Sequence, residues 1–400
     1  MNPIKKINLI VCLLLFPFLS HCRNDELDVI KTYSPTQNPI FGLVYYILPG
    51  QGFSFSGGGG GSLVPNQAGK TENSKFILWG ASNNVPAIWS TNDGSTFNSK
   101  ITISSIPNCS NQFVSGGESR FCRVISFASA GTTNHAIIAS ATYSGNPSSA
   151  TSLKLYYGTS GTDNSYSFNE ITADLGITIS NVALFSGAWN GAADSSGNFA
   201  LIIKQNTVSN RLCGRSVGGN WVCEASTSGS AVRNLNGTIY AGYGRRWNGT
   251  GFENAATNGG GPDDLLQIGS RILFSIGSGG SYTTDALPWN GAITLTASTI
   301  PATGINNFSP RLVEVTGQPF RYSQDSPKIY YRSTTDLGNN YSSISEISDI
   351  SYSRFDGYSI GSIGGKVILI ISGNRSGETT FSTKIFSSTN GFSNWTEITP

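Results

Sequence analysis

The chain has little charge. Asp, Glu, Lys and Arg make up 12% of its 400 residues, against about 25% in an average soluble protein. Glycine is plentiful at 48 residues, and the hydrophobic fraction of 38% is ordinary. Ser, Thr, Asn and Gly favour turns, so this composition predicts many short strands joined by turns. A repetitive all-β fold can hold this length in one domain.

Histidine is also scarce, and the cysteines lack the spacing typical of metal sites. The two histidines are His21 and His135. His21 lies at the end of a leader segment, so His135 alone would remain after processing. This excludes a centre built from several histidines, and a Ser-His-Asp triad would depend on this one residue. The C-x2-C spacing typical of zinc sites is absent.

Long hydrophobic runs are absent except near the N-terminus. Lys5 and Lys6 precede an almost wholly apolar run from Leu9 to Leu19. A membrane-spanning helix needs about 20 apolar residues, so this run predicts a secretion signal and no spanning helix.

The segment "LSHC" at 19–22 follows that run and resembles a bacterial lipoprotein signal. In such signals a leucine lies three residues before a cysteine that is acylated after cleavage, which makes Cys22 the expected lipidation site. His21 departs from the small residue usual before that cysteine. An ordinary signal peptide with a chance cysteine is the alternative. We expect an exported lipoprotein of the bacterial cell envelope, anchored at the outer membrane by its lipid alone.

The leader divides the chain into three parts. Residues 1–21 form the lipoprotein signal peptide, 22–40 a flexible tether, and 41–400 the folded body. Removing Lys5 and Lys6 leaves 23 basic and 23 acidic residues. A net charge of zero gives no support to nucleic-acid binding. We expect a monomer.

Four cysteines of the body form two close pairs. In an exported protein this spacing favours two local disulfides, Cys109 with Cys122 and Cys213 with Cys223. A zinc site made of all four cysteines is the alternative, which the missing C-x2-C spacing disfavours.

Four segments of the chain resemble one another. Each has an aromatic or β-branched strand, a polar turn and a second strand that ends in Ile-Thr or Ile-Ser, which predicts a β-hairpin. The segments are "AIWSTNDGSTFNSKIT" from Ala87, "LKLYYGTSGTDNSYSFNEIT" from Leu153, "KIYYRSTTDLGNNYSSISEIS" from Lys328 and "KIFSSTNGFSNWTEIT" from Lys384.

The turns of these hairpins resemble the Asp-box (BNR repeat) of sialidase-like β-propellers, whose pattern is Ser/Thr-x-Asp-x-Gly-x-Thr-Trp/Phe. The matching residues are Ser90, Asn92, Gly94, Thr96 and Phe97 in the first copy, Thr334, Asp336, Gly338 and Tyr341 in the third, and Ser388, Asn390 and Trp395 in the last. A short Asp or Asn side chain accepts hydrogen bonds from its own turn, and Gly adopts positive φ. These residues are therefore interpreted as structural, with the terminal aromatic packed between sheets.

Seven apolar strands recur at quasi-regular distances. They begin at Lys75, His135, Phe199, Thr238, Ile272, Pro319 and Lys366. With about 50 residues per unit and other strands between them, the pattern predicts one all-β propeller of four-stranded blades. Seven blades fit best, and six is the alternative.

The triplet "WNG" occurs three times, at Trp189, Trp247 and Trp289. Asn-Gly is the preferred pair for a tight hairpin turn, so each tryptophan is first interpreted as a wedge beside a turn. The functional alternative is that the three indole rings offer flat faces on which a sugar ring stacks.

The resemblance to sialidases implies a test for catalysis. Those enzymes use three arginines to bind a carboxylate, a Tyr nucleophile activated by Glu, and an Asp as acid, and their first arginine usually lies in the first blade. Residues 40–105 contain no arginine. We assign no catalytic residue. The expected function is a non-enzymatic envelope module that binds a protein or glycan through its loops. A sialidase-like glycoside hydrolase and a scaffold for envelope assembly remain alternatives.

No cofactor or metal ligand is assigned. The loop "DSSGN" at 194–198 has oxygen atoms that could hold calcium, but it lacks the full EF-hand spacing. The adjacent acidic residues Asp263 and Asp264 are interpreted as the polar start of a strand, because neighbouring residues on a strand point to opposite faces.

Overall fold

The computed structural model describes the chain from residue 69 onward, in segments. These segments are 69–72, 75–82, 85–97, 99–109, 112–114, 118–144, 150–161, 164–177, 191–203, 210–226, 231–241, 244–255, 264–276, 280–284, 287–289, 294–301, 308–325, 328–375, 382–389 and 391–399. All belong to the second of two compact units, Phe55–Pro400. The predicted signal peptide, Cys22 and the tether lie outside the described residues.

The described strands form seven antiparallel sheets, and each sheet is built from strands that are consecutive in sequence. Blade 1 contains β1 (Gly69–Glu72), β2 (Lys75–Ser82), β3 (Val85–Thr91) and β4 (Ser99–Thr102); blade 2 contains β5 (Gln112–Val114), β6 (Glu118–Ala130), β7 (Thr133–Ser144), β8 (Ala150–Ser160) and β9 (Ser167–Glu170); blade 3 contains β10 (Gly191–Ala193), β11 (Phe199–Ile203), β12 (Asn210–Arg215) and β13 (Val222–Ser226).

The remaining four blades follow the same order. Blade 4 contains β14 (Val232–Leu235), β15 (Thr238–Ala241), β16 (Arg245–Trp247) and β17 (Phe252–Asn254); blade 5 contains β18 (Asp264–Ile268), β19 (Arg271–Ile276), β20 (Gly280–Thr284) and β21 (Thr296–Ala297); blade 6 contains β22 (Phe308–Val315), β23 (Gln318–Asp325), β24 (Lys328–Ser333) and β25 (Ser345–Glu346); blade 7 contains β26 (Tyr352–Ile363), β27 (Lys366–Arg375), β28 (Ser382–Ser388) and β29 (Thr396–Ile398).

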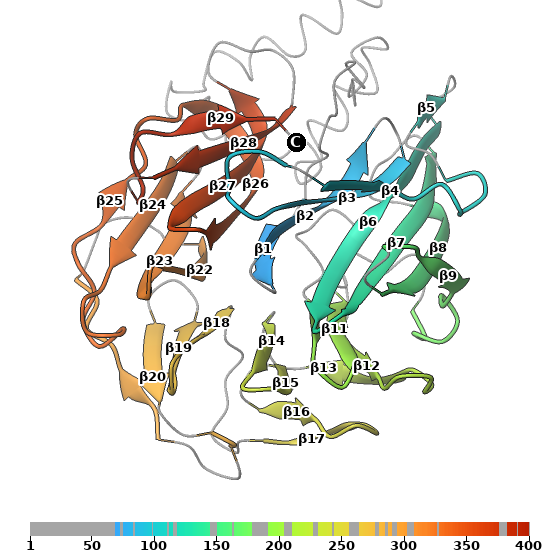
Figure 1. The fold of residues 1–400 in the computed structure, drawn as a ribbon, viewed down its shortest axis with the longest axis horizontal. Coiled ribbons are helices and arrows are strands. Elements are labelled where there is room, and N and C mark those ends of the chain that lie inside the picture. Colours follow the sequence, from blue (N-terminus) through green and yellow to red (C-terminus); the bar gives the residue numbers. More distant parts are fainter. Residues whose placement is uncertain are drawn as a thin grey trace, which may run out of the picture. The chain divides into compact units, whose positions relative to one another are not determined.

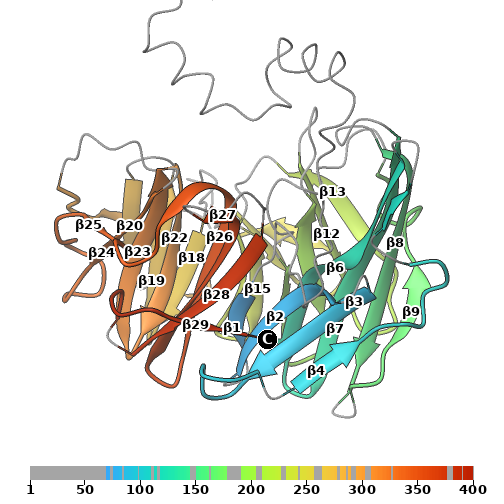
Figure 2. The ribbon, with the colours of Figure 1, turned by 90° about the horizontal axis from the view of Figure 1, so that it is seen from above.

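The blades are arranged in a ring (Figure 1). Contacts between inner strands run from β6 to β10, β14, β18, β22 and β26 in turn, and β1 contacts both β26 and β6. Figure 2 shows the strands of blades 1 and 2 lying next to each other from the side. The fold is a seven-bladed all-β propeller, as predicted, with seven blades rather than six. Blade 2 differs from the prediction by one extra strand, β5, which pairs with β6.

Six of the seven predicted apolar strands are the second strands of their blades, namely β2, β11, β15, β19, β23 and β27, and the seventh, β7, is the third of the five strands of blade 2. The predicted hairpins are the outer strand pairs of blades 1, 2, 6 and 7. Second strands are apolar because both faces of a blade pack against neighbouring blades. All five residues of β11, for example, are buried. A strand covered on both faces reads as a continuous hydrophobic run.

Blades 7 and 1 close the ring by side-chain packing in the described residues. Phe76 and Trp89 of blade 1 share a buried cluster with Ile368 and Ile370 of blade 7. At Gly94, where φ is +65°, a Cβ atom would lie 2.9 Å from Cγ2 of Ile363. Both the backbone angle and this close approach require glycine.

Both predicted disulfides are present. Cys109 bonds to Cys122, with their Cα atoms 5.3 Å apart. Cys213 and Cys223 are cross-strand partners on β12 and β13, with Cα atoms 4.1 Å apart. The alternative zinc site made of four cysteines is therefore wrong.

In the described part of the chain, no helix has the length and hydropathy needed to cross a bilayer.

Candidate functional site: a cleft between blades 1 and 2

A cleft of about 380 Å³ lies between blades 1 and 2. Its apolar wall is formed by Ile77, Ile88 and Ile101 from blade 1 and by Phe127 and Tyr166 from blade 2. The β6–β7 turn and the loop between β8 and β9 border it. The cleft is therefore at the end of the propeller that carries the β6–β7 turn and the β8–β9 loop.

The rest of the lining is polar. It consists of Lys75, Ser90, Ser99, Ser129, Thr132, Asn134 and Asn164, together with Gly131 and Trp89. Among the described residues, the hydroxyl groups of Ser90 and Ser99 make no hydrogen bond to a protein group. Hydroxyl and amide groups beside an apolar wall can bind a ligand that has both hydroxyl groups and carbon faces.

The alternation of the strands produces this lining. Ser90 on β3 is the cross-strand partner of Ile77 on β2 and of Ser99 on β4. Ile88, two residues earlier on β3, faces the same side and is paired with Ile101. Side chains two residues apart on a strand share a face, so Ser90 and Ile88 line the same cleft. Ser90 and Ser99 are nearer the β3–β4 loop, and Ile88 and Ile101 lie farther from that loop along the same strands.

The cleft carries little charge. Lys75 is exposed and supplies an ammonium group. Burial raises the pKa of the Tyr166 phenol to about 12. Tyr166 is therefore a neutral phenol at physiological pH, and its ring stacks on Phe168 with 5.5 Å between centroids. No carboxylate belongs to the lining formed by described residues.

The first recurring turn is held one residue later than the sequence pattern placed it. Thr91 Oγ1 accepts a hydrogen bond from the Gly94 amide at 3.0 Å, and the Asp93 carboxylate accepts one from the Ser95 amide at 2.8 Å. These bonds come from Thr91 and Asp93 instead of Ser90 and Asn92. The hydrogen bonds that Asp93 accepts from the amides of Ser95 and Thr96 lower its pKa. Because β3 continues to Thr91, the Ser90 side chain is left to line the cleft.

The turn at 334–341 is held by the residues the pattern named. Thr334 Oγ1 donates to Asp336 at 2.7 Å and accepts from the Gly338 amide at 3.1 Å. Asp336 also accepts from the Asn340 amide at 2.9 Å. These hydrogen bonds, led by those from Asn340, lower the pKa of Asp336 to about 2. The Tyr341 side chain is buried.

In the last copy, Ser388 donates to the Ser393 carbonyl. Trp395 packs against the cluster shared by blades 6 and 7, and its indole donates to the Phe392 carbonyl at 3.3 Å. Asn390 lies outside the described residues. In the first copy, Phe97 packs against the cluster between blades 7 and 1. The terminal aromatics of these turns thus lie against contacts between blades.

The proposed ligand-stacking tryptophans do not present open faces. Trp247 is 5% exposed and packs between blades 3 and 4, and Trp289 is 0% exposed and packs between blades 4 and 5. The Trp289 ring meets Tyr240 and Phe274 with centroids 4.7 and 5.5 Å away. Both rings are covered by neighbouring blades, so for these two the stacking interpretation is wrong and the wedge interpretation holds. Trp189 lies outside the described residues.

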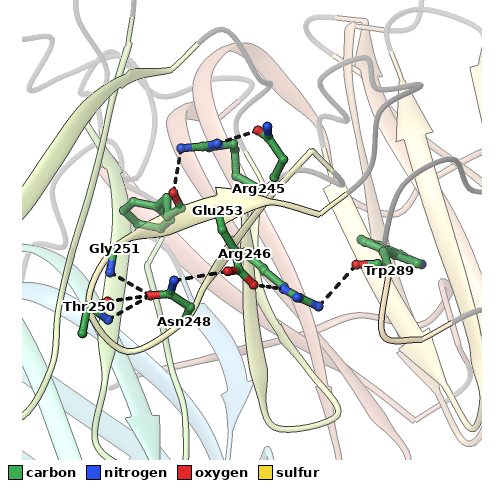
Figure 3. Close-up of polar contacts among 9 residues, drawn as sticks. Arg245, Arg246, Asn248, Thr250, Gly251, Glu253 and Trp289 are labelled. Atoms are coloured by element: carbon green, nitrogen blue, oxygen red, sulfur yellow. Dashed lines mark hydrogen bonds and ion pairs between the residues drawn. The ribbon is translucent and has the colours of Figure 1, made fainter.

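The arginines bind separate partners. Arg245 makes a two-pronged contact with Glu224 of blade 3, at 2.7 and 2.5 Å. The next residue, Arg246, points the other way: it donates to Glu253 at 2.5 Å and to the Trp289 carbonyl at 3.3 Å (Figure 3). This pairing raises the pKa of Arg246 and lowers that of Glu253. The two neighbours tie blade 4 to blade 3 and to blade 5.

Other guanidinium groups are fixed elsewhere. Arg233 on β14 pairs with the buried Asp264 at 2.6 Å, and Asp264 accepts from the Leu312 amide at 3.0 Å. This links blades 4, 5 and 6, and Asp264 begins β18 as predicted. Arg332 donates to the carbonyls of Ser342 and Pro301. These described arginines therefore do not form the three-arginine clamp that the sialidase alternative needs.

His135 and the loop at 194–198 have structural partners. His135 is 1% exposed, its Nδ1 is hydrogen-bonded to the Tyr157 hydroxyl at 2.8 Å, and it stacks on Phe199. Asp194 accepts from the amides of Ser196 and Asn198 at 2.9 and 3.0 Å. A search of the described residues finds no cluster of His, Cys, Asp and Glu suited to a metal ion.

Sequence reasoning missed the cleft itself. The repeat predicted seven contacts between blades, but it gives no sign of which one leaves a gap. The serine pair at 90 and 99 gives no such sign, because the equivalent pairs of blades 2 and 7, Thr159 with Ser167 and Ser387 with Thr396, are polar as well.

No protein-family model and no curated protein sequence matches this chain. Among solved structures, a Trypanosoma rangeli sialidase is similar at 11% identity and a TM-score of 0.41, covering 82% of this chain and 55% of that one. AofleA from Arthrobotrys oligospora is similar at 12% identity and a TM-score of 0.45, covering 85% and 88%. The fucose-specific lectin from Aleuria aurantia is similar at 11% identity and a TM-score of 0.42, covering 84% and 96%. The chain spans about half the length of the sialidase, and identities this low transfer no activity.

Proposed function

We propose that this propeller is a binding module of the cell envelope that holds a glycan segment in the cleft between blades 1 and 2. The observation that carries the proposal is the composition of the cleft. Two serine hydroxyls without a partner among the described residues, Ser90 and Ser99, lie beside an apolar wall that includes Phe127 and Tyr166. Polar ligand groups find hydrogen-bond partners there, and the carbon faces of a sugar find a dry surface.

The described lining of the cleft contains no carboxylate, which favours binding over hydrolysis. Glycoside hydrolysis ordinarily needs two carboxyl groups that flank the scissile bond, or a nucleophile with its base. The described lining offers hydroxyl and amide groups and one ammonium, that of Lys75. These groups fix and orient a neutral ligand.

Acylation of Cys22 belongs to the same proposal. The lipid would hold the body at the membrane surface, and residues 22–40 would give it reach. Mass spectrometry of the mature N-terminus tests this part by itself, since a first residue other than a modified Cys22 removes the anchor and leaves the cleft untouched.

A glycan array probed with the purified mature protein tests the function. We expect binding to a small group of glycans that share one terminal or repeating unit. The Ser99→Trp variant should lose this binding, because an indole on β4 would fill the cleft. Ser167→Trp is the matched control, since Ser167 lies on the outer strand of blade 2 but does not line the cleft. An array with no saturable signal, together with co-purification of envelope proteins by the same sample, would instead support the scaffold alternative.

A further inference from the structure

A second surface lies in blade 3, at the end of β12. Arg215 is the last residue of β12, and its guanidinium carbon lies 4.8 Å from the ring centroid of Tyr157 and 5.7 Å from that of Trp221. Tyr157 belongs to blade 2 and Trp221 to the turn before β13. The cation is thus held across two aromatic rings at the contact between blades 2 and 3.

The aromatic support is itself rigid. Tyr157 packs against Phe199 with 5.8 Å between centroids, and its hydroxyl is hydrogen-bonded to His135 at 2.8 Å. Trp221 meets both Tyr157 and Phe199 edge to face, at 5.2 and 6.1 Å. Burial raises the pKa of Tyr157 to about 12, so the ring beneath Arg215 is neutral at physiological pH.

Arg215 differs from the other arginines whose contacts are described. Arg233, Arg245 and Arg246 each pair with a carboxylate at 2.5–2.6 Å. The Arg215 guanidinium makes no hydrogen bond or ion pair with another described residue. Its donors, arranged as a planar fork, are half-buried and held in place. A guanidinium that is already ordered loses little freedom when it binds a carboxylate.

An exposed aliphatic side chain lies two residues from this cation along the chain. Val217, two residues further along the same turn, is 71% exposed, one of the two large hydrophobic residues in the described part of the chain that are exposed. Gly197 of the neighbouring turn leaves room for it, since a Cβ atom there would lie 2.7 Å from Val217 Cγ2. The surface therefore combines a carboxylate-binding fork with an aliphatic contact.

We propose that Arg215 and Val217 form a docking surface for a protein partner that presents an acidic residue beside an aliphatic one. The carboxylate of the partner binds the guanidinium fork, and its aliphatic side chain covers Val217. A peptide fits this surface better than an acidic sugar does, because Arg215 already covers the faces of Tyr157 and Trp221 and leaves no open aromatic platform. This surface is separate from the cleft of the proposed function.

Fluorescence anisotropy with a labelled peptide tests the proposal. The probe is a flexible Gly-Ser peptide with a central Asp-Leu pair, titrated with the intact mature protein. Two further peptides replace Asp by Asn or Leu by Ser. We expect saturable binding of the Asp-Leu probe, a loss of at least about tenfold with Asn, and a smaller loss with Ser.

Variants locate the binding. Arg215→Gln should weaken the Asp-Leu probe at least about tenfold, and Arg215→Lys should weaken it less, because it keeps the charge without the fork. Lys100→Gln is the matched control, since Lys100 also lies over an aromatic ring, Trp89, in blade 1 and should leave binding unchanged. Unaltered near-ultraviolet circular dichroism would show that each variant is folded. Absence of saturable binding, equal affinity of the Arg215→Gln variant, or displacement of the peptide by equimolar glucuronate would each overturn the proposal.

Discussion

Gly214 and Trp247 are fitted to each other across the contact between blades 3 and 4. A Cβ atom on Gly214 would lie 2.7 Å from Cε3 and Cζ3 of the indole. Gly214 sits on β12 and Trp247 ends β16, so a residue without a side chain in one blade makes room for the largest side chain of the next. This fit explains why Trp247, one of the "WNG" tryptophans, belongs to the core.

This fit predicts a non-additive pair of substitutions. Trp247→Ala should lower the free energy of unfolding by about 3–5 kcal/mol because it leaves a cavity. Gly214→Ala should also destabilise, because the new methyl group meets the indole. In the Trp247→Ala background the Gly214→Ala change should cost much less, as urea unfolding of the four proteins would measure. Equal costs in both backgrounds would show that the indole is not what requires glycine.

The pair of Arg245 and Glu224 should couple blades 3 and 4. Their side chains are 24% and 33% exposed, so solvent screens the two-pronged contact and its coupling energy should be about 1 kcal/mol. A double-mutant cycle with Arg245→Met and Glu224→Gln measures it. The coupling should shrink as salt is raised, and a coupling near zero at low salt would contradict the contact.

Asp336 should make stability depend on pH in the acid range. Hydrogen bonds from Asn340 and Thr334 lower its folded pKa from 3.8 to about 2. A depressed pKa contributes stability that is complete above the unfolded value near 4 and is lost as the pH falls toward 2. Asp336→Asn should therefore be less stable than the natural protein at pH 6, by about 1 kcal/mol after allowance for solvent. The two stability curves should converge near pH 2, and parallel curves down to that pH would rule out this contribution.

A kinetic assay distinguishes the proposed binding function from the sialidase alternative. Three of the described arginines are held by three separate carboxylates, Arg233 by Asp264, Arg245 by Glu224 and Arg246 by Glu253. We expect no enzyme-like release of the fluorophore from a fluorogenic sialoside by the purified mature protein. Turnover that survives repurification and is lost in an arginine variant would favour the hydrolase.

The repeat of apolar strands was sufficient to predict the propeller and its seven blades. The strand that corresponds to β2 in each blade is covered on both faces, so a continuous apolar run marks it in the sequence at every repeat. The disulfide pairs were also predictable, because close spacing in an exported chain restricts the partners. Both predictions depend on residues that are close together in the sequence.

Contacts between blades could not be predicted in the same way. The hydrogen bonds of the first turn come from Thr91 and Asp93, one residue past the predicted positions, because β3 runs on to Thr91. Whether an aromatic residue is buried depends on the neighbouring blade, as Gly214 shows for Trp247. Ser90 and Ser99 line the cleft between blades 1 and 2, and no periodicity within a blade reports that a gap remains at this contact.

The most direct test of the cleft is a calorimetric titration of one array-selected glycan into three proteins: the natural mature chain, Ser99→Trp and Ser167→Trp. If the glycan binds in the cleft, the natural chain and Ser167→Trp should have equal affinity, and Ser99→Trp should lose at least about tenfold. All three proteins should have similar melting temperatures. Undiminished affinity in a folded Ser99→Trp protein would place the binding elsewhere and contradict glycan binding in the cleft between blades 1 and 2.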